Sequence, residues 1–148
     1  MNSLIQVITA FAGSLGFGIL YNIRSYRLFV VGTGGMIGWI AYLYAYHISS
    51  DKIISVFVAT LVVVLLSEIL ARVIRTPVTT LLVPMLIPLV PGGDLFYATS
   101  HLVLNEIEKF QYYLSLVTKE AAAIASGIIL MTCIVQIIQH LLSLSKKS

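Results

Sequence analysis

The chain has 148 residues, of which 59% are hydrophobic and 10% are charged, and its mean hydropathy is +1.00. So little polar surface cannot coat a water-soluble globule, and the net charge of +3 comes from residues at the ends of apolar runs, which excludes a nucleic-acid-binding patch. The composition therefore predicts an all-α integral membrane protein that lies in a lipid bilayer.

Four long apolar runs predict membrane-spanning helices, because each has about the 20 residues that a helix needs to cross a bilayer. They cover about residues 4–21, 28–46, 53–71 and 117–142. A fifth segment, about residues 78–104, is predicted to be helical and broken near residues 88–93. Residues 1–148 then form a single transmembrane domain of about five helices.

Pairs of small residues four positions apart indicate close packing, because they let two helix backbones approach each other. The pairs are Ala12 with Gly16, Ser14 with Gly18, Gly34 with Gly38, and Ala123 with Gly127. They fit packing within the chain, and they also fit a contact with another subunit, including a second copy of this chain. Cys133 is the only cysteine and is interpreted as a small buried hydrophobic residue.

Basic residues predict the orientation of the chain, because short loops rich in Lys and Arg stay on the cytoplasmic side of a membrane. The six that decide it are Arg24, Arg27, Arg72, Arg75, Lys146 and Lys147. They share one side if residues 78–104 cross the membrane completely, which places the N-terminus outside and the C-terminus in the cytoplasm. If this segment re-enters and returns to its starting side, the C-terminus faces outward instead.

The fifth segment carries helix-breaking residues in an apolar stretch. They are Pro84, Pro88, Pro91, Gly92 and Gly93. Each interior proline removes a backbone donor and costs about 3 kcal/mol or more. If a helix begins near Val78, Pro88 lies about 16 Å along it, which is about half of an apolar layer about 30 Å thick. The break is therefore predicted near the bilayer midplane.

Two interpretations of this break are open. In the first, the carbonyls of Thr80, Pro84 and Ile87 lose their helical donors and point into a cavity. The glycines then allow a sharp turn, and the N-terminus of the next half-helix attracts a carboxylate, as in the broken helices of many secondary transporters. In the second, the prolines only kink the helix, and neighbouring groups satisfy its backbone. We adopt the first.

The ionisable side chains of Asp94, Glu68 and Arg72 lie in or beside apolar runs and are candidates for function. Asp94 follows the glycines, where it binds a substrate ammonium group or carries a coupling proton, or else caps the second half-helix. Glu68 lies four residues before Arg72, a spacing typical of a helix-surface ion pair, with a gate or proton relay as the alternative.

A polar stripe follows the fifth segment at helical spacing. It consists of His101, Asn105, Glu108 and Tyr112. The pattern predicts a helix at the membrane surface, with an outward exit path as the alternative. Histidine is the side chain best suited to exchange protons near neutral pH, so His101 is a candidate proton relay.

The sequence lacks the groups that the common enzyme classes need. An intramembrane aspartyl dyad needs a second membrane aspartate, and Asp51 lies in a loop. No histidine–carboxylate cluster suits a metal ion, and no glycine-rich loop suits a nucleotide. The chain is therefore predicted to be no enzyme, to hold no metal or cofactor, and to take any energy from an ion gradient.

Two stretches of the sequence resemble the small, YjjB-like membrane component of the threonine/serine exporter (ThrE-like) family. They are GFGILYNIRSYRL at 16–28, with Asn22 and Arg27 at family positions, and TPVTTLLVPMLIPLVPGGDLFY at 76–97, with Pro77, Pro88, Pro91, Gly92 and Tyr97. The resemblance extends over nearly the whole chain.

This resemblance implies a bacterial cytoplasmic (inner) membrane protein that exports small carboxylate metabolites, either threonine and serine or succinate. It also implies a second, larger membrane component, so the chain resembles half of a two-component exporter with Tyr97 near the substrate path. The alternative is a structural or assembly subunit that does not contact substrate.

Overall fold

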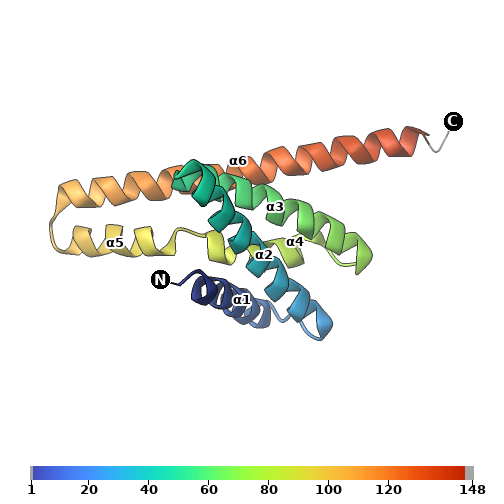
Figure 1. Cartoon of the computed structure of the whole chain (residues 1–148), viewed down its shortest axis with the longest axis horizontal. Coiled ribbons are helices and arrows are strands. Elements are labelled where there is room, and N and C mark those ends of the chain that lie inside the picture. Colours follow the sequence, from blue (N-terminus) through green and yellow to red (C-terminus); the bar gives the residue numbers. More distant parts are fainter. Residues whose placement is uncertain (1, 146–148) are drawn as a thin grey trace.

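The computed structural model describes residues 2–145, which are helical apart from short connections. The elements are α1 (Ser3–Leu20), α2 (Tyr26–Ser49), α3 (Lys52–Val73), α4 (Val78–Leu86), η1 (Ile87–Leu89), α5 (Gly92–Val103) and α6 (Ile107–Ser145) (Figure 1). Among these, α1, α2, α3 and α6 are long and apolar enough to span a membrane, and the pair of α4–η1 and α5, bent by 57°, adds one more if it forms a single span. The predicted all-α membrane fold with a broken fourth span is confirmed. Lys146 and Lys147, used to predict the orientation, lie outside the described residues.

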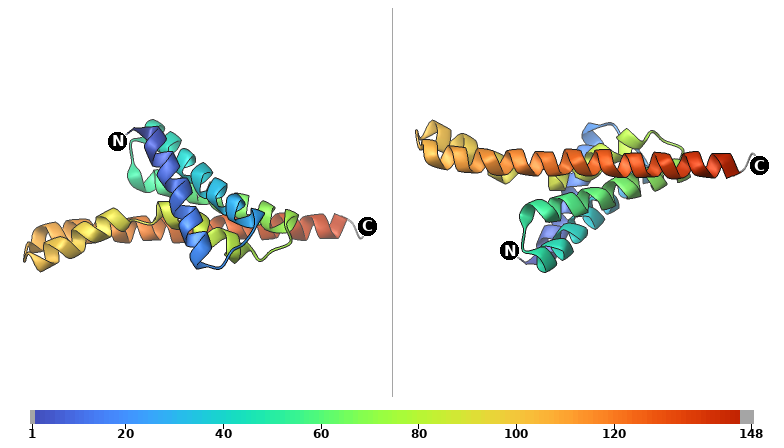
Figure 2. Two further views of the ribbon diagram at one scale, coloured as in Figure 1. Left: turned by 90° about the horizontal axis from the view of Figure 1, so that it is seen from below. Right: turned by 90° about the horizontal axis from the view of Figure 1, so that it is seen from above.

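The long helix α6 forms one edge of the molecule. α5 folds back against its first half and α3 packs along its second half, while α1 and α2 run obliquely to them (Figures 1 and 2). α3 and α6 run in the same direction, since Lys52 meets Glu120 at one end and Thr60 meets Gly127 further along. Their parallel packing brings the start of α3 beside the middle of α6.

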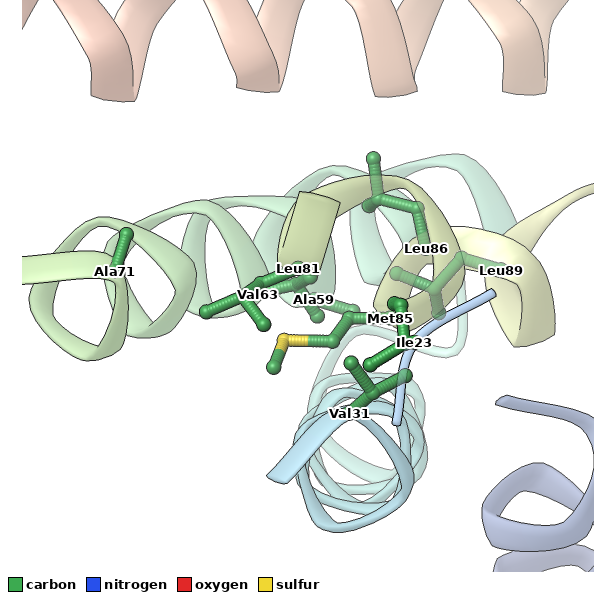
Figure 3. Packing of buried hydrophobic residues seen from close by; sticks show 9 residues of the cluster. All are labelled: Ile23, Val31, Ala59, Val63, Ala71, Leu81, Met85, Leu86 and Leu89. Atoms are coloured by element: carbon green, nitrogen blue, oxygen red, sulfur yellow. The ribbon is translucent and has the colours of Figure 1, made fainter. Parts of the chain in front are cut away.

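The core lies where α2, α3 and α4 meet. Leu81 and Met85 of α4 are fully buried against Val31 of α2 and Val63 of α3 (Figure 3). Glycines make this approach possible: a Cβ on Gly34 would collide with Met85, and one on Gly38 would collide with Val63. The small-residue pairs at 34/38, 14/18 and 123/127 therefore pack within the chain, whereas Ala12 and Gly16 are exposed.

Cys133 is exposed on α6, so the prediction that it is buried is wrong. The reason is that α6 contacts only α3 and α5 among the described elements, which leaves most of its surface outside the protein core.

The break between α4 and α5 differs in detail from the predicted one. The α-helix ends at Leu86, two residues after Pro84, and continues as the 3₁₀ turn η1. The carbonyl of Ile87 accepts a hydrogen bond from Val90 N at 3.1 Å, so it is not one of a column of unpaired carbonyls. The chain turns at Val90 and Pro91, and Gly92 and Gly93 begin α5 without positive φ angles. The turn therefore does not depend on the conformational freedom of glycine.

The predicted single surface helix with the polar stripe is also wrong. His101 lies on α5, Asn105 in the turn with φ 58°, and Glu108 and Tyr112 on α6. Glu106 N donates to His101 O at 2.9 Å and Asn105 N to Leu102 O at 3.1 Å, which is the Schellman pattern that ends a helix. Because Asn105 tolerates the left-handed conformation, α5 ends there and α6 begins well before the predicted residue 117.

Candidate transport site

A cavity of about 170 Å³ lies at the break between η1 and α5. The break contributes five of the predicted site residues to its wall: Pro88, Pro91, Gly92, Gly93 and Asp94. Its lining also includes Trp39 and Tyr42 of α2, Lys52 of α3 and Glu120 of α6. The structure thus joins the proline–glycine segment to charged residues of α3 and α6 and to aromatic residues of α2.

Three charged side chains from three helices meet at this cavity. Lys52 contacts the carboxylate of Asp94, and its Nζ lies 2.7 Å from Glu120 Oε1. Asp51 fixes the start of α3, because its Oδ1 accepts from Ile53 N at 2.7 Å and from Ile54 N at 3.1 Å. Lys52 is therefore held as the first helical residue, facing α5 and α6.

Asp94 pairs with a lysine and does not cap its own helix. The N-cap of α5 is Pro91, no side chain makes a cap hydrogen bond there, and Asp94 lies within the first turn. The alternative that Asp94 serves as the N-cap is therefore wrong. The structure instead places Asp94 beside the first residue of α3, so its pairing joins α5 to α3.

The cluster holds more negative than positive charge. Glu120 is 1% exposed and Asp94 is 14% exposed, while Lys52 is 44% exposed. Glu120 Oε1 makes no hydrogen bond, so its contact with Lys52 is an ion pair without hydrogen-bond geometry. A buried carboxylate is costly unless it is paired and hydrogen-bonded. Glu120 is thus a buried carboxylate that depends on Lys52 as its charge partner.

A second cavity of about 270 Å³ adjoins the first between α1, α2 and η1. The two share Trp39 and Pro88, and the second is also lined by Gln6, Thr9 and Gly13. Trp39 Nε1 donates to Gln6 Oε1 at 3.3 Å, and the Trp39 ring stacks on Tyr42 at 4.8 Å between centroids. Trp39 and Pro88 therefore separate an apolar cavity beside α1 from the charged cavity.

Tyr97 and His101 lie further along α5 and do not line the charged cavity. The rings of both stack on Tyr113 of α6, at centroid distances of 5.3 Å and 5.4 Å. His101 Nδ1 lies 2.6 Å from Glu106 Oε2, and Lys109 Nζ lies 3.0 Å from the same oxygen. The hydrogen bonds from Lys109 and His101 lower the pKa of Glu106 below its ordinary value. These contacts between α5 and α6 stabilise the turn that connects the two helices.

Glu68 and Arg72 form the predicted ion pair, with Arg72 Nη2 2.8 Å from Glu68 Oε2. Glu68 lies about 24 Å along α3 from Lys52, given a rise of about 1.5 Å per residue. The pair is therefore remote from the charged cavity, and a helix-surface role explains it.

The family-pattern residues outside the break lie at helix ends. Asn22 ends α1 with φ 57°, and Ile23 N donates to Gly18 O at 2.9 Å in a Schellman pattern. Arg27 lines a separate hollow of about 390 Å³ at the α1–α2 turn. Pro77 is the N-cap of α4, and Pro84 is buried in the core rather than in the cavity wall.

Lys52, Glu120, Trp39 and Tyr42 were not predicted as site residues. The sequence places Lys52 and Glu120 among the charges that flank apolar runs, and it places the two aromatic residues in an interfacial belt. One signal points to Glu120: it directly precedes the apolar stretch of the last helix, and an ionisable residue within a membrane helix is a functional candidate by default.

Four apolar helices and a bent helix pair with a charged cavity at its break define a multi-pass membrane protein. The chain belongs to the threonine/serine exporter family: it matches Threonine/Serine exporter, ThrE, over residues 6–134. Members of this family are transporters and not enzymes. Neither the curated proteins nor the solved structures gave a match to this chain.

Proposed function

We propose that this chain is the small membrane subunit of a two-component secondary exporter of small carboxylate metabolites, namely threonine and serine or succinate. The cavity at the break forms part of the substrate path. The observation that carries the proposal is the cluster of Lys52, Asp94 and Glu120, which lines a cavity at a discontinuous helix. The family of the chain supports the same activity.

The cavity has the chemistry that a small charged metabolite requires. Lys52 offers a cation for a substrate carboxylate, and the first turn of α5 adds the positive end of a helix dipole at Gly92 and Gly93. Asp94 and Glu120 offer anions for a substrate ammonium group. A volume of about 170 Å³ equals that of about six water molecules at about 30 Å³ each, which suits a solute of small amino acid size.

We infer a bacterial cytoplasmic membrane location, with the N-terminus outside and the C-terminus in the cytoplasm. The larger component of the exporter is the expected partner. The exposed apolar surface of α6, which contacts only α3 and α5 among the described elements, leaves room for it. The exposed Ala12 and Gly16 leave room for a second copy of this chain on α1.

The test is export by the two components together. The chain is co-purified with the larger component, and inside-out vesicles are assayed for uptake of labelled threonine, serine and succinate in parallel. Asp94→Asn removes a charge-assisted contact worth about 1.5–3 kcal/mol, so we expect uptake to fall about tenfold to a hundredfold while co-purification stays intact. Pro91→Ala should also abolish uptake and leave assembly intact.

Glu108→Gln is the matched control, because Glu108 is exposed on the first turn of α6. Loss of co-purification in Asp94→Asn, rather than loss of uptake alone, would favour the structural or assembly subunit. Uptake by this chain without the larger component would overturn the two-component organisation.

A further inference from the structure

We propose that Trp39 sets the size of substrate that this exporter accepts, because its indole ring closes the charged cavity toward the apolar cavity beside α1. This inference rests on the proposed function, since it takes the charged cavity as part of the substrate path. It adds a residue that selects among solutes with the same charged groups, which Lys52, Asp94 and Glu120 do not tell apart.

The lining of the charged cavity is of two kinds. Lys52, Asp94 and Glu120 bring charge, while Trp39 and Val56 bring apolar surface. The charged groups of a substrate belong beside the three charged side chains, because burying a charge against apolar surface is costly. The rest of the substrate therefore meets the apolar lining, in which the indole of Trp39 is the largest side chain.

The Trp39 ring is held in place by contacts with two helices. Its Nε1 donates to Gln6 Oε1 of α1 at 3.3 Å, and the side chain is partly buried. The ring also stacks on Tyr42 of α2, with 4.8 Å between centroids and 27° between the ring planes. Because both contacts are lost if the ring turns away, the indole forms a fixed wall between the two cavities.

The space behind this wall is open. Trp39 and Pro88 border both cavities, and the apolar one has about 270 Å³ against about 170 Å³ for the charged one. Ala10 and Ile87 contribute to its apolar lining, and a Cβ added to Gly13 would meet no atom within 4 Å. Pro88 belongs to the backbone break, so Trp39 is the side chain that can be shortened to join the two cavities without altering the break.

The size limit follows from this arrangement. In the wild type, a solute with a large apolar group has to displace the indole, which then loses its hydrogen bond and its stacking contact. With alanine at position 39, the same group enters the space of the indole and the apolar cavity behind it. The fit of an apolar group in a pocket discriminates by about tenfold to two-hundredfold, so we expect a change of this order in the preference for a solute that carries a phenyl ring.

The experiment measures competition for uptake into inside-out vesicles that hold the two-component complex. Phenylalanine competes with labelled threonine, and phenylsuccinate competes with labelled succinate, so each competitor keeps the charged groups of the solute and carries a phenyl ring. The readout is the concentration of competitor that halves uptake, divided by the concentration of unlabelled threonine or succinate that does so. This ratio does not depend on the amount of folded complex. Trp39→Ala should lower it about tenfold or more, and Trp39→Phe, which keeps a ring, should lower it less.

Two matched variants distinguish a wall of the cavity from a residue that only supports the fold. Tyr44→Ala removes an aromatic side chain of the same helix that is 69% exposed, and it should leave the ratio at the wild-type value. Gly13→Leu places a side chain in the apolar cavity, so it should restore the wild-type ratio when combined with Trp39→Ala. By itself, Gly13→Leu should leave uptake near the wild-type level.

An unchanged ratio in Trp39→Ala vesicles that still take up threonine or succinate would overturn this inference and leave the exporter function standing. Loss of uptake in Gly13→Leu alone, with assembly intact, would also overturn it, because the apolar cavity would then be part of the path itself. If Trp39→Ala does not assemble, Trp39→Leu takes its place, and its ratio should fall below that of Trp39→Phe. A complex that transports none of threonine, serine and succinate would contradict the proposed function and this inference with it.

Discussion

At the scale of single residues, helix ends in this protein depend on side chains that accept the left-handed backbone conformation. Asn22, Arg75 and Asn105 have φ angles of 57°, 51° and 58°, and each follows the last residues of a helix. In each case the next amide donates back to a carbonyl of the last helical turn. Asn tolerates this conformation better than other residues with a Cβ atom, which explains two of the three positions.

Substitutions of Asn22 test whether this family-pattern residue is needed for the backbone conformation at the end of α1 or for transport of the substrate. Asn22→Gly keeps the left-handed conformation and should leave both stability and uptake near the wild-type level. Asn22→Val should lower the stability by about 1–2 kcal/mol, because a β-branched side chain strains this conformation. Thermal unfolding of the solubilised complex measures the change in stability, and vesicle uptake measures the change in transport. If Asn22→Gly is stable but inactive, the side chain serves the substrate.

At the scale of helices, packing is decided by which small residues face a neighbour. Gly38 meets Val63 of α3, whereas a Cβ on Gly16 of α1 would have no atom within 4 Å. Both glycines belong to pairs with the same spacing, so spacing predicts that helices pack closely but not which face is used. The two positions therefore form a matched pair for substitution.

Gly38→Ala should destabilise the chain by about 1–3 kcal/mol, because the added methyl group overpacks the α2–α3 contact. Gly16→Ala should stabilise it by about 0.5–1 kcal/mol, because alanine is the better residue inside a helix. Thermal unfolding of the chain in detergent measures both. A reduced yield of the two-component complex for Gly16→Ala would show instead that this face of α1 contacts the partner or a second copy.

At the scale of the whole molecule, the broken span decides on which side of the membrane the α5–α6 turn lies. α4 and α5 are bent by 57°, and the long α6 carries the chain back along α5 before packing on α3 (Figure 1). A complete crossing puts the α3–α4 turn and the α5–α6 turn on opposite sides. A re-entrant segment puts them on the same side.

Cysteine labelling distinguishes these arrangements. In a Cys133→Ala background, we expect Glu108→Cys to react with a membrane-impermeant maleimide on intact cells, and Thr76→Cys to react only after the cells are broken. Thr76 lies in the α3–α4 turn and Glu108 in the first turn of α6, and both lie outside the core. Equal protection of the two cysteines in intact cells would establish the re-entrant arrangement and place the C-terminus outside.

The sequence alone determined the membrane class, the four apolar spans and the break, because each follows from local chemistry: apolar length matches the bilayer, and proline removes a helical donor. Only the tertiary structure decided that Lys52, Asp94 and Glu120 share one cavity. Lys52 and Glu120 meet because α3 and α6 pack in parallel around Gly127 and Thr60, and their register depends on the fit of two surfaces distant in sequence. No local pattern encodes such a fit, so neither residue was predicted for the site.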